Sequence, residues 1–353
     1  MIKRWLNRVF IDGLSGMATG LFATLIIGTI ISQVGTIIGG ETGQYLILMS
    51  SVAKALTGVG IGVGVAHKYG ESPLVTVSAA SAGMIGAFAS KLLAGEVIVD
   101  GVIHLSGAGE PLGAFVAAYV GIELGHFVSG KTKLDILVTP IISILCGGLI
   151  GLLVGPPISQ FMTKLGQMIQ WGTEQQPFLM GIVVSVLMGM ILTLPISSAA
   201  LGIVLNLSGI SAGAAAIGCS TQMVGFAVAS FRENGFAGLL AQGIGTSMLQ
   251  VPNIVKKPMI WIPPILASAI LGPVSTMVLK MTNNAIGSGM GTAGLVGQIM
   301  GYQTMVAEGT SANIVLAEII VMHIIVPAIL TYVIAEWMRR KGLIKEGDMK
   351  LDL

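Results

Sequence analysis

Apolar residues run along this chain in long blocks, which are separated by short glycine-rich or charged segments. The first half contains blocks at about 12–38, 46–66, 73–94, 111–129 and 135–155. A membrane-spanning α-helix needs about 20 consecutive, predominantly apolar residues. The pattern therefore predicts that the first half crosses a membrane repeatedly as α-helices.

The second half is less regular. Apolar blocks lie at about 177–194, 209–230, 258–281 and 313–338, with shorter glycine-rich pieces at 196–208, 235–250 and 285–301. Irregular backbone at membrane depth is tolerated only where it is buried in protein or lines a cavity. Both chain ends are expected on one side, which requires an even number of spans. We therefore predict about ten spans and two re-entrant hairpins, with the assignment of 195–312 left open.

Two segments have the pattern of amphipathic helices that lie in the membrane interface. Residues 1–10 place Ile2, Trp5 and Val9 on one face and basic residues elsewhere. Residues 156–171 begin with two prolines, end with a tryptophan and carry apolar residues at helical spacing. The second segment is expected to separate two halves: a scaffold and dimerisation half at 1–172, and a substrate-binding transport half at 173–353.

Charge along the loops predicts the orientation. Lys68 and the lysines of the 129–133 turn fall on the same side as the N-terminus, whereas the 96–110 loop has no Lys or Arg. Cytoplasmic loops carry the excess of Lys and Arg, so both the N-terminus and the basic segment 339–341 are expected in the cytoplasm. No cleaved signal peptide is expected, because no short apolar segment with a cleavage site follows the basic start.

Composition narrows the class of protein. The chain is 54% hydrophobic and 10% charged, whereas soluble domains carry about a quarter charged residues. The net charge of +2 gives no reason to expect a nucleic-acid partner. Cys146 and Cys219 lie inside apolar blocks and are expected to pack as small residues. We find no phosphate-binding loop, nucleophile elbow or zinc-protease motif, so we expect no catalytic residues, no metal and no cofactor. The expected fold is an all-α polytopic membrane protein.

Neutral polar residues concentrate in the short segments of the second half. Such residues suit an uncharged, polyhydroxylated ligand better than an ion, although each can instead satisfy backbone groups at a helix break. For Gln242 we favour a ligand role, because a buried amide is costly without a partner. The candidates for substrate binding are Ser197, Ser198, Asn206, Gln242, Thr246, Ser247, Asn283 and Asn284.

Ionisable residues inside spans are functional candidates by default. Glu123 and His126 lie one helical turn apart and are interpreted as a polar pair, because two ligands alone do not make a metal site. Glu318 and His323 are expected to pack within the bundle. Glu308 lies beside a glycine-rich segment and is the strongest acidic candidate, so it joins the predicted substrate site.

Three motifs in the second half resemble those of a known family. TLPISSAA at 193–200 is similar to the GGPVNKAA motif of fructose-type enzyme IIC, the membrane component of the bacterial phosphotransferase sugar system. GLLAQGIGT at 238–246 is similar to that branch's GITEGAIPF motif, and KPMIWIP at 257–263 to its DPLRVIP motif. The whole chain resembles stand-alone IIC-like proteins of the perfringolysin-regulator type.

The resemblance implies several further properties. It implies the glucose-superfamily IIC architecture: ten spans with two re-entrant hairpins, in a homodimer embedded in the lipids of the bacterial plasma membrane. It implies a sugar site near the motif glutamate, and phosphorylation of the sugar by a separate cytoplasmic IIB protein rather than by this chain.

The sequence departs from the family at its charged motif positions. Gln242 stands for the glutamate, Ser197 and Ser198 for Asn and Lys, and Lys257 for Asp. A glutamine cannot act as a general base. Three functional hypotheses follow: a permease that carries a sugar or a related polar solute by alternating access; a transport-derived membrane sensor that binds ligand without phosphorylation-coupled transport; and an ion-coupled carrier. The substrate, the coupling to phosphorylation and the IIB partner stay open.

Overall fold

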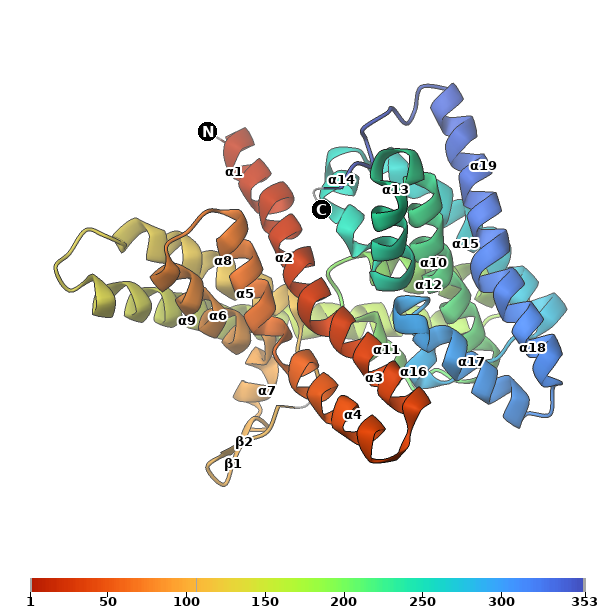
Figure 1. The fold of residues 1–353 in the computed structure, drawn as a ribbon, viewed down its shortest axis with the longest axis horizontal. Coiled ribbons are helices and arrows are strands. Elements are labelled where there is room, and N and C mark those ends of the chain that lie inside the picture. Colours follow the sequence, from red (N-terminus) through yellow and green to blue (C-terminus); the bar gives the residue numbers. More distant parts are fainter. Residues whose placement is uncertain (1, 106, 352–353) are drawn as a thin grey trace. The chain divides into compact units, whose positions relative to one another are not determined.

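The computed structural model describes residues 2–105 and 107–351, and helices make up nearly all of its regular structure (Figure 1). The strands in this part are β1 (Ile98–Val99) and β2 (Val102–Ile103), which pair antiparallel with Ile98 opposite Ile103. The chain divides into two compact units, Met1–Thr163 and Lys164–Leu353. The fold is therefore all-α, as the apolar pattern predicts.

Unit 1 begins with one long apolar helix from Trp5 to Ile38. The helix expected at 1–10 is present in its described residues, but no break separates it from this long helix, which it enters through a π-helical turn at Arg8–Gly13. Its position in the membrane interface stays a prediction. The helices of unit 1 are α1 (Ile2–Asn7), α2 (Leu14–Leu21), α3 (Ile27–Ile38), α4 (Gly40–Ala55), α5 (Thr57–Lys68), α6 (Pro73–Ala87), α7 (Ala89–Leu93) and α8 (Pro111–Val128), with π-helical η1 (Arg8–Gly13) and η2 (Phe22–Ile26).

Glycines bring the helices of unit 1 into backbone contact. A methyl group on Gly20 of α2 would overlap the carbonyl of Gly60 in α5, and one on Gly62 would overlap the carbonyl of Ala79 in α6. Small residues allow this close packing of membrane helices. The alternating glycines at 58–65 therefore let α5 lie directly against helices on two sides.

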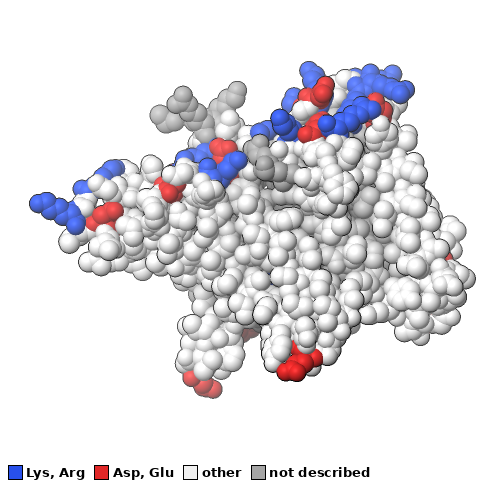
Figure 2. All heavy atoms as spheres, viewed as in Figure 1, with Lys and Arg blue, Asp and Glu red and all other residues white. Residues whose placement is uncertain are grey.

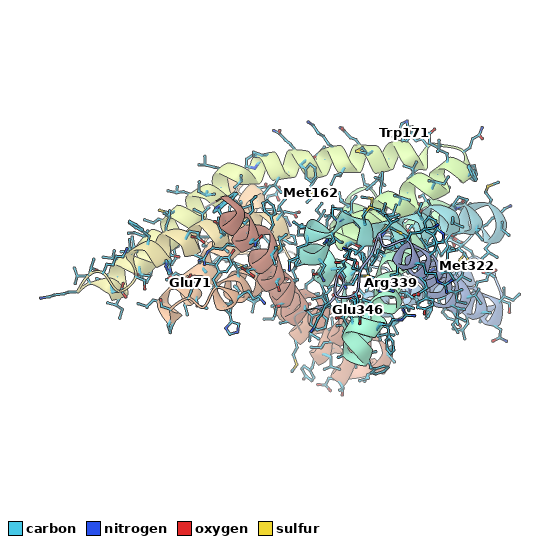
Figure 3. The ribbon with its side chains drawn as sticks, turned by 90° about the horizontal axis from the view of Figure 1, so that it is seen from above. Glu71, Met162, Trp171, Met322, Arg339 and Glu346 are labelled. Carbon is cyan, nitrogen blue, oxygen red and sulfur yellow. The ribbon has the colours of Figure 1, made fainter. Side chains whose placement is uncertain are left out.

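Helix α9 (Asp135–Thr173) runs for 39 residues and continues past the boundary between the two units (Figure 3). The expected break at Pro156 is absent, because Pro140, Pro156 and Pro157 all lie inside the helix. The end of the membrane span and the in-plane position of 156–171 stay predictions. Each proline removes one backbone hydrogen bond but does not have to end a helix that neighbours support. A helix of this length is about twice as long as the ~30 Å hydrocarbon layer is thick.

Unit 2 contains the broken helices. Its α-helices are α10 (Pro177–Thr193), α11 (Ser198–Val204), α12 (Gly209–Ala229), α13 (Phe231–Leu240), α14 (Val251–Lys256), α15 (Ile262–Pro273), α16 (Ala285–Ser288), α17 (Val296–Ala307), α18 (Ala312–Ile319) and α19 (Val326–Arg340). Short π and 3₁₀ segments join them: η3 (Ala241–Gly245), η4 (Ser247–Gln250), η5 (Pro258–Trp261), η6 (Val274–Leu279), η7 (Ala293–Leu295) and η8 (Ile320–Ile325).

Helix α12 forms the centre of unit 2. It packs against α10, α15 and α19, and almost all of its side chains are buried. Its sequence is rich in Gly, Ala and Ser, so neighbouring backbones approach closely; a methyl group at Gly218 would overlap the carbonyl of Ser185 in α10. Because most side chains of α12 are small, its few polar side chains lie close to the elements packed around it.

Six of the described helices are long and apolar enough to cross a membrane. A seventh span results if α4 and α5, which are bent by 54°, count together, and α6 and α10 are shorter apolar helices. The polytopic all-α class is therefore confirmed, whereas the total of ten spans stays a prediction.

Candidate functional site

Two interrupted segments of unit 2 meet beside α12. The first hairpin, residues 231–256, bends at Gly235 and contains η3 and η4; the second, residues 285–307, contains α16, η7 and α17. Segment η3 contacts both η7 and α12, and α16 packs on α12 as well. Gly291 of the second hairpin has φ +51° and lies so close that a β-carbon would be 2.7 Å from the carbonyl carbon of Cys219. Both hairpins thus reach the middle of the central helix.

At this point α12 carries the polar run Ser220, Thr221 and Gln222, each fully buried. The first hydrogen-bond network centres on Gln222. Its Oε1 accepts from Trp261 Nε1 at 2.9 Å and from Thr193 Oγ1 at 3.3 Å. The Thr193 hydroxyl also lies 2.8 Å from the Ser247 hydroxyl of the first hairpin. The Gln222 Nε2 is buried and has no hydrogen-bond partner among the described residues.

The second network joins α12 to the second hairpin and to η8. Gln298 Nε2 donates to Ser220 Oγ at 3.1 Å and contacts His323 Nδ1 at 2.8 Å. An amide nitrogen only donates, so His323 Nδ1 accepts and the ring proton resides on Nε2. The Oε1 of Gln298 and the hydroxyl of Thr221 are buried without a partner among the described residues. The His323 ring in this arrangement is neutral and so are its partners, so the second network carries no formal charge.

Gln242 lies in η3 and is completely buried. Its Nε2 donates to Ser230 Oγ and to the Gly238 carbonyl, both at 2.9 Å. Its Oε1 accepts from Gln250 Nε2 at 2.8 Å. Both amide hydrogens are therefore used within the protein, in a third network that is made by the first hairpin.

The other predicted site residues divide into several groups. Ser198 is buried and donates to the Gly289 carbonyl at 2.6 Å, which ties α11 to the second hairpin. Ser197 precedes it and is half-buried. Ser247 belongs to the Gln222 network, whereas Thr246 accepts from the Met248 amide at 3.1 Å and caps η4. Ser198, Ser247 and Thr246 therefore lie on or against the two hairpins.

The remaining predicted residues shape the ends of helices. Asn284 caps α16 by accepting from Ile286 and Gly287 amides, and Asn283 donates to the Gly297 carbonyl at 2.9 Å. Asn206 is exposed and has φ +47° just after α11, a conformation that Asn tolerates. Glu308 is exposed and accepts from Thr282 Oγ1 at 2.5 Å. Asn206 and Glu308 therefore make none of the contacts of the buried networks.

Glu123 and His126 belong to a larger cluster in unit 1. Arg8 donates to Glu123 at 2.6 Å and to Glu71 at 3.1 Å, and His126 Nδ1 lies 2.8 Å from Glu71. The Tyr69 hydroxyl donates to the Arg8 carbonyl, and burial raises the pKa of this phenol. The cluster therefore ties the first helix to the turn between α5 and α6 and to the last turns of α8. Among the described residues, no group of three or more His, Cys, Asp or Glu residues is placed to hold a metal ion.

Comparison with known families agrees with this architecture. The model of the family described as phosphotransferase system, EIIC matches residues 11–351, which includes the central helix and both hairpins. The chain belongs to the EIIC family. A search of curated proteins returns no match to it. An EIIC protein is the membrane permease component of its system, and the family implies a sugar-like substrate and a IIB component as a partner.

Sequence reasoning missed several residues of this EIIC chain. The site candidates were taken from the interrupted segments. Gln222, Ser220 and Thr193 were not among them, because they lie inside regular apolar blocks. A signal was nevertheless present, because a Ser-Thr-Gln run at 220–222 is costly in the middle of a span unless it has partners. His323 was expected to pack within the bundle and Gln298 lies in the glycine-rich piece 285–301, but nothing in their spacing indicated that they meet.

Proposed function

We propose that this EIIC protein binds an uncharged, polyhydroxylated solute of the sugar class beside the middle of α12. The observation that carries the proposal is a set of three buried polar atoms without partners among the described residues: Thr221 Oγ1, Gln222 Nε2 and Gln298 Oε1. They comprise a hydroxyl, an amide donor and a carbonyl acceptor. Buried polar groups normally have partners, and sugar hydroxyls both donate and accept.

The predicted site residues take different parts in this proposal. Ser247 is linked to the proposed site through Thr193 of the Gln222 network, whereas Ser198 holds the second hairpin. Gln242, Thr246, Asn283 and Asn284 hold the hairpins in shape through the bonds described above. We assign no direct ligand contact to Asn206 or Glu308, because both are exposed.

Transport is proposed to occur by alternating access, in which the hairpins of unit 2 move while unit 1 serves as a scaffold and as the dimer contact. Interrupted helices at membrane depth support such a site in transporters. Gln242 supplies no base for the sugar hydroxyl, so we assign this chain binding and translocation alone. Any phosphoryl transfer belongs to a separate IIB protein.

The orientation in the bacterial plasma membrane is also proposed, with both chain ends in the cytoplasm. In unit 1, basic residues gather at the end that carries the Arg8 cluster, whereas acidic residues mark the opposite end (Figure 2). In unit 2, basic residues gather where α19 ends and the C-terminal segment follows. Both distributions support the positive-inside orientation.

The test is a thermal-shift screen of the detergent-solubilised chain against sugars, polyols and their phosphates. A ligand at a hundred times its dissociation constant stabilises the folded protein by about 2.7 kcal/mol. We expect a neutral sugar or polyol to raise Tm, and the shift to disappear in Gln222→Leu and Gln298→Leu. Gln303→Leu is the matched control, because Gln303 lies on the same helix as Gln298 but is exposed. A shift that both buried variants retain would place the ligand elsewhere.

Uptake into proteoliposomes then separates transport from the other hypotheses. The proposal expects facilitated uptake of the bound compound that persists when proton and sodium gradients are dissipated. Loss of uptake on dissipation would favour an ion-coupled carrier, and binding without uptake would favour a sensor.

A further inference from the structure

The C-terminal segment after α19 returns to the first hairpin of unit 2. The Met349 side chain is completely buried. It packs in one apolar cluster whose other buried members are Phe226, Ala229, Ile254, Ile260, Ala335, Met338 and Ile344. The cluster draws on α12, on α14 of the first hairpin, on η5 and on α19, and Ile344 joins it from the segment after α19. The Met349 side chain thus packs against residues of α12, α14 and η5, which are about 90 residues or more away in the sequence.

Side chains around this cluster bind the backbone of the tail. Glu233 Oε2 accepts from the Met349 amide at 2.8 Å. Asn234 donates to the Met349 carbonyl at 2.9 Å and accepts from the Leu351 amide at 2.8 Å. This pair of bonds holds the backbone of the tail at two positions, where the turn at 346–349 ends.

Two further amides complete the arrangement. Gln250 Nε2 donates to the Met349 carbonyl and Asn253 Nδ2 to the Lys350 carbonyl, at 3.0 and 2.9 Å. We call Glu233, Asn234, Gln250 and Asn253 the tail site. Its hydrogen bonds with the tail are to backbone atoms, whereas the apolar cluster receives the Met349 side chain.

The tail site is directly connected to Gln242. The Nε2 group of Gln250 donates both to the Met349 carbonyl and to Gln242 Oε1. Asn253 in turn donates to Gln250 Oε1 at 2.9 Å. One amide group therefore links the tail to the residue at the family's glutamate position. Removal of the tail would leave buried donors on Gln250 and Asn253 without these acceptors, which is unfavourable.

Arg339 supports the same region from α19. Its Nη2 donates to the Ala229 carbonyl at 2.7 Å and lies 3.5 Å from Glu233 Oε1. Figure 3, which looks onto this end of unit 2, labels Arg339 and Glu346 there. The guanidinium holds the Glu233 carboxylate while its other oxygen receives the Met349 amide. The tail site thus offers the tail backbone positioned donors and an acceptor, and it offers the Met349 side chain an apolar pocket.

We propose that residues Met349–Leu351 are a releasable latch on the first hairpin. When the tail is docked, Gln250 stays bonded to Gln242 and the hairpin is closed. When the tail leaves, Gln250 loses its second acceptor, its bond to Gln242 is no longer held in place by the tail, and the tail site is open. Control of substrate binding by this latch rests on the proposed function, whereas the latch itself does not.

Hydrogen exchange of the full chain in detergent tests the latch first. Asn234→Ala removes both a donor and an acceptor for the tail backbone. We expect the Leu351 amide and the amides of residues 241–250 to exchange at least about tenfold faster than in the unaltered chain, since exchange follows the population of the open state. Lys350→Ala is the matched control, because its side chain is exposed and only its carbonyl is bound. Unchanged exchange at 241–250 in Asn234→Ala overturns the proposal.

Rescue in trans distinguishes a displaced latch from a misfolded hairpin. A chain that ends at Gly347 should show the same rapid exchange at 241–250. The synthetic peptide KEGDMKLDL, residues 345–353, should restore protection in a saturable manner. The same peptide with Met349→Asp should not, because a carboxylate cannot enter the apolar pocket. Equal rescue by both peptides, or by neither, overturns the proposal. If the shortened chain does not fold, Met349→Asp in the full chain must reproduce the exchange of Asn234→Ala.

These measurements contain no sugar. A negative ligand screen would therefore reject the proposed function while leaving the latch standing. Exchange that is insensitive to the tail would reject the latch while leaving sugar binding standing.

Discussion

At the scale of single residues, Gln242 shows how the chain accommodates its departure from the family motif. Its amide nitrogen donates to Ser230 and to the Gly238 carbonyl, and its oxygen accepts from Gln250. A carboxylate accepts hydrogen bonds but donates none when it is ionised. The partners of this position are therefore matched to an amide, and the glutamine has a structural role that a glutamate would not fill.

Gln242→Glu should consequently destabilise the protein. The Gly238 carbonyl would face a carboxylate oxygen instead of an N–H group, and a buried unsatisfied group costs roughly 1–3 kcal/mol. We expect a lower Tm in detergent than for Gln303→Glu, which places the same charge on an exposed position of α17. Equal Tm values for the two variants would contradict the assigned hydrogen bonds.

Glu110 leads to a prediction about pH. It precedes α8, and burial raises the pKa of its carboxyl to about 7. A raised carboxyl pKa means that the folded state holds the proton more tightly than the unfolded state. Stability from this group is therefore present below about pH 4.5 and is lost as the pH rises towards 7. Between pH 5 and 7.5, Tm should fall less in Glu110→Gln than in the unaltered chain. A parallel decline in both would assign the pH dependence to other groups.

At the scale of elements, contact of the second hairpin with α12 depends on Gly291. Its positive φ and the nearby Cys219 backbone both disfavour a side chain. Gly309 also has a positive φ, of +97°, but a β-carbon there would meet nothing within 4 Å. Alanine substitutions at the two glycines therefore distinguish the cost of backbone strain, which both share, from the cost of steric overlap, which only Gly291 has.

Gly291→Ala should lower Tm more than Gly309→Ala, because only the first change also pushes the hairpin away from α12. A difference of at least ~1 kcal/mol is expected, which is the typical cost of overpacking a tight contact. In the ligand screen, Gly291→Ala should also reduce the ligand-induced shift. If both alanine variants lose the same stability, close approach contributes nothing measurable.

At the scale of the whole molecule, unit 1 differs from unit 2 in how its polar residues are arranged. Unit 1 joins Arg8, Glu71, Glu123 and His126 in a cluster at one end, whereas unit 2, besides an ion pair of Arg339 with Glu233, buries neutral polar networks beside its central helix. This difference supports a scaffold role for unit 1 and a binding role for unit 2. The same division underlies the proposal that subunits associate through unit 1.

Light scattering on the detergent-purified chain should give a protein mass of twice that of one chain. Since the proposed contact is made by unit 1, the exchange variant Asn234→Ala in unit 2 should leave this mass unchanged. A monomeric mass over a range of protein concentrations and mild detergents would contradict the dimer.

The sequence by itself determined the class of protein and the region of interest. The lipid environment requires long apolar helices wherever the chain crosses it, so the blocks at 111–129 and 209–230 correspond closely to α8 and α12. For the same reason, irregular backbone was expected in glycine-rich pieces such as 235–250, where η3 and η4 lie. These conclusions depend on local composition, which a sequence displays directly.

Only the tertiary structure decided which polar residues meet. Gln222 accepts hydrogen bonds from Thr193 and Trp261, which are 29 and 39 residues away, and Gln250 donates to Met349, which is 99 residues away. It also decided that α9 continues through Pro156, because support from neighbouring elements is not visible in local sequence. Hydrogen bonds form between groups that the fold brings together, and no periodicity records such pairings. The networks beside α12 and the docking of the tail are therefore properties of the folded chain.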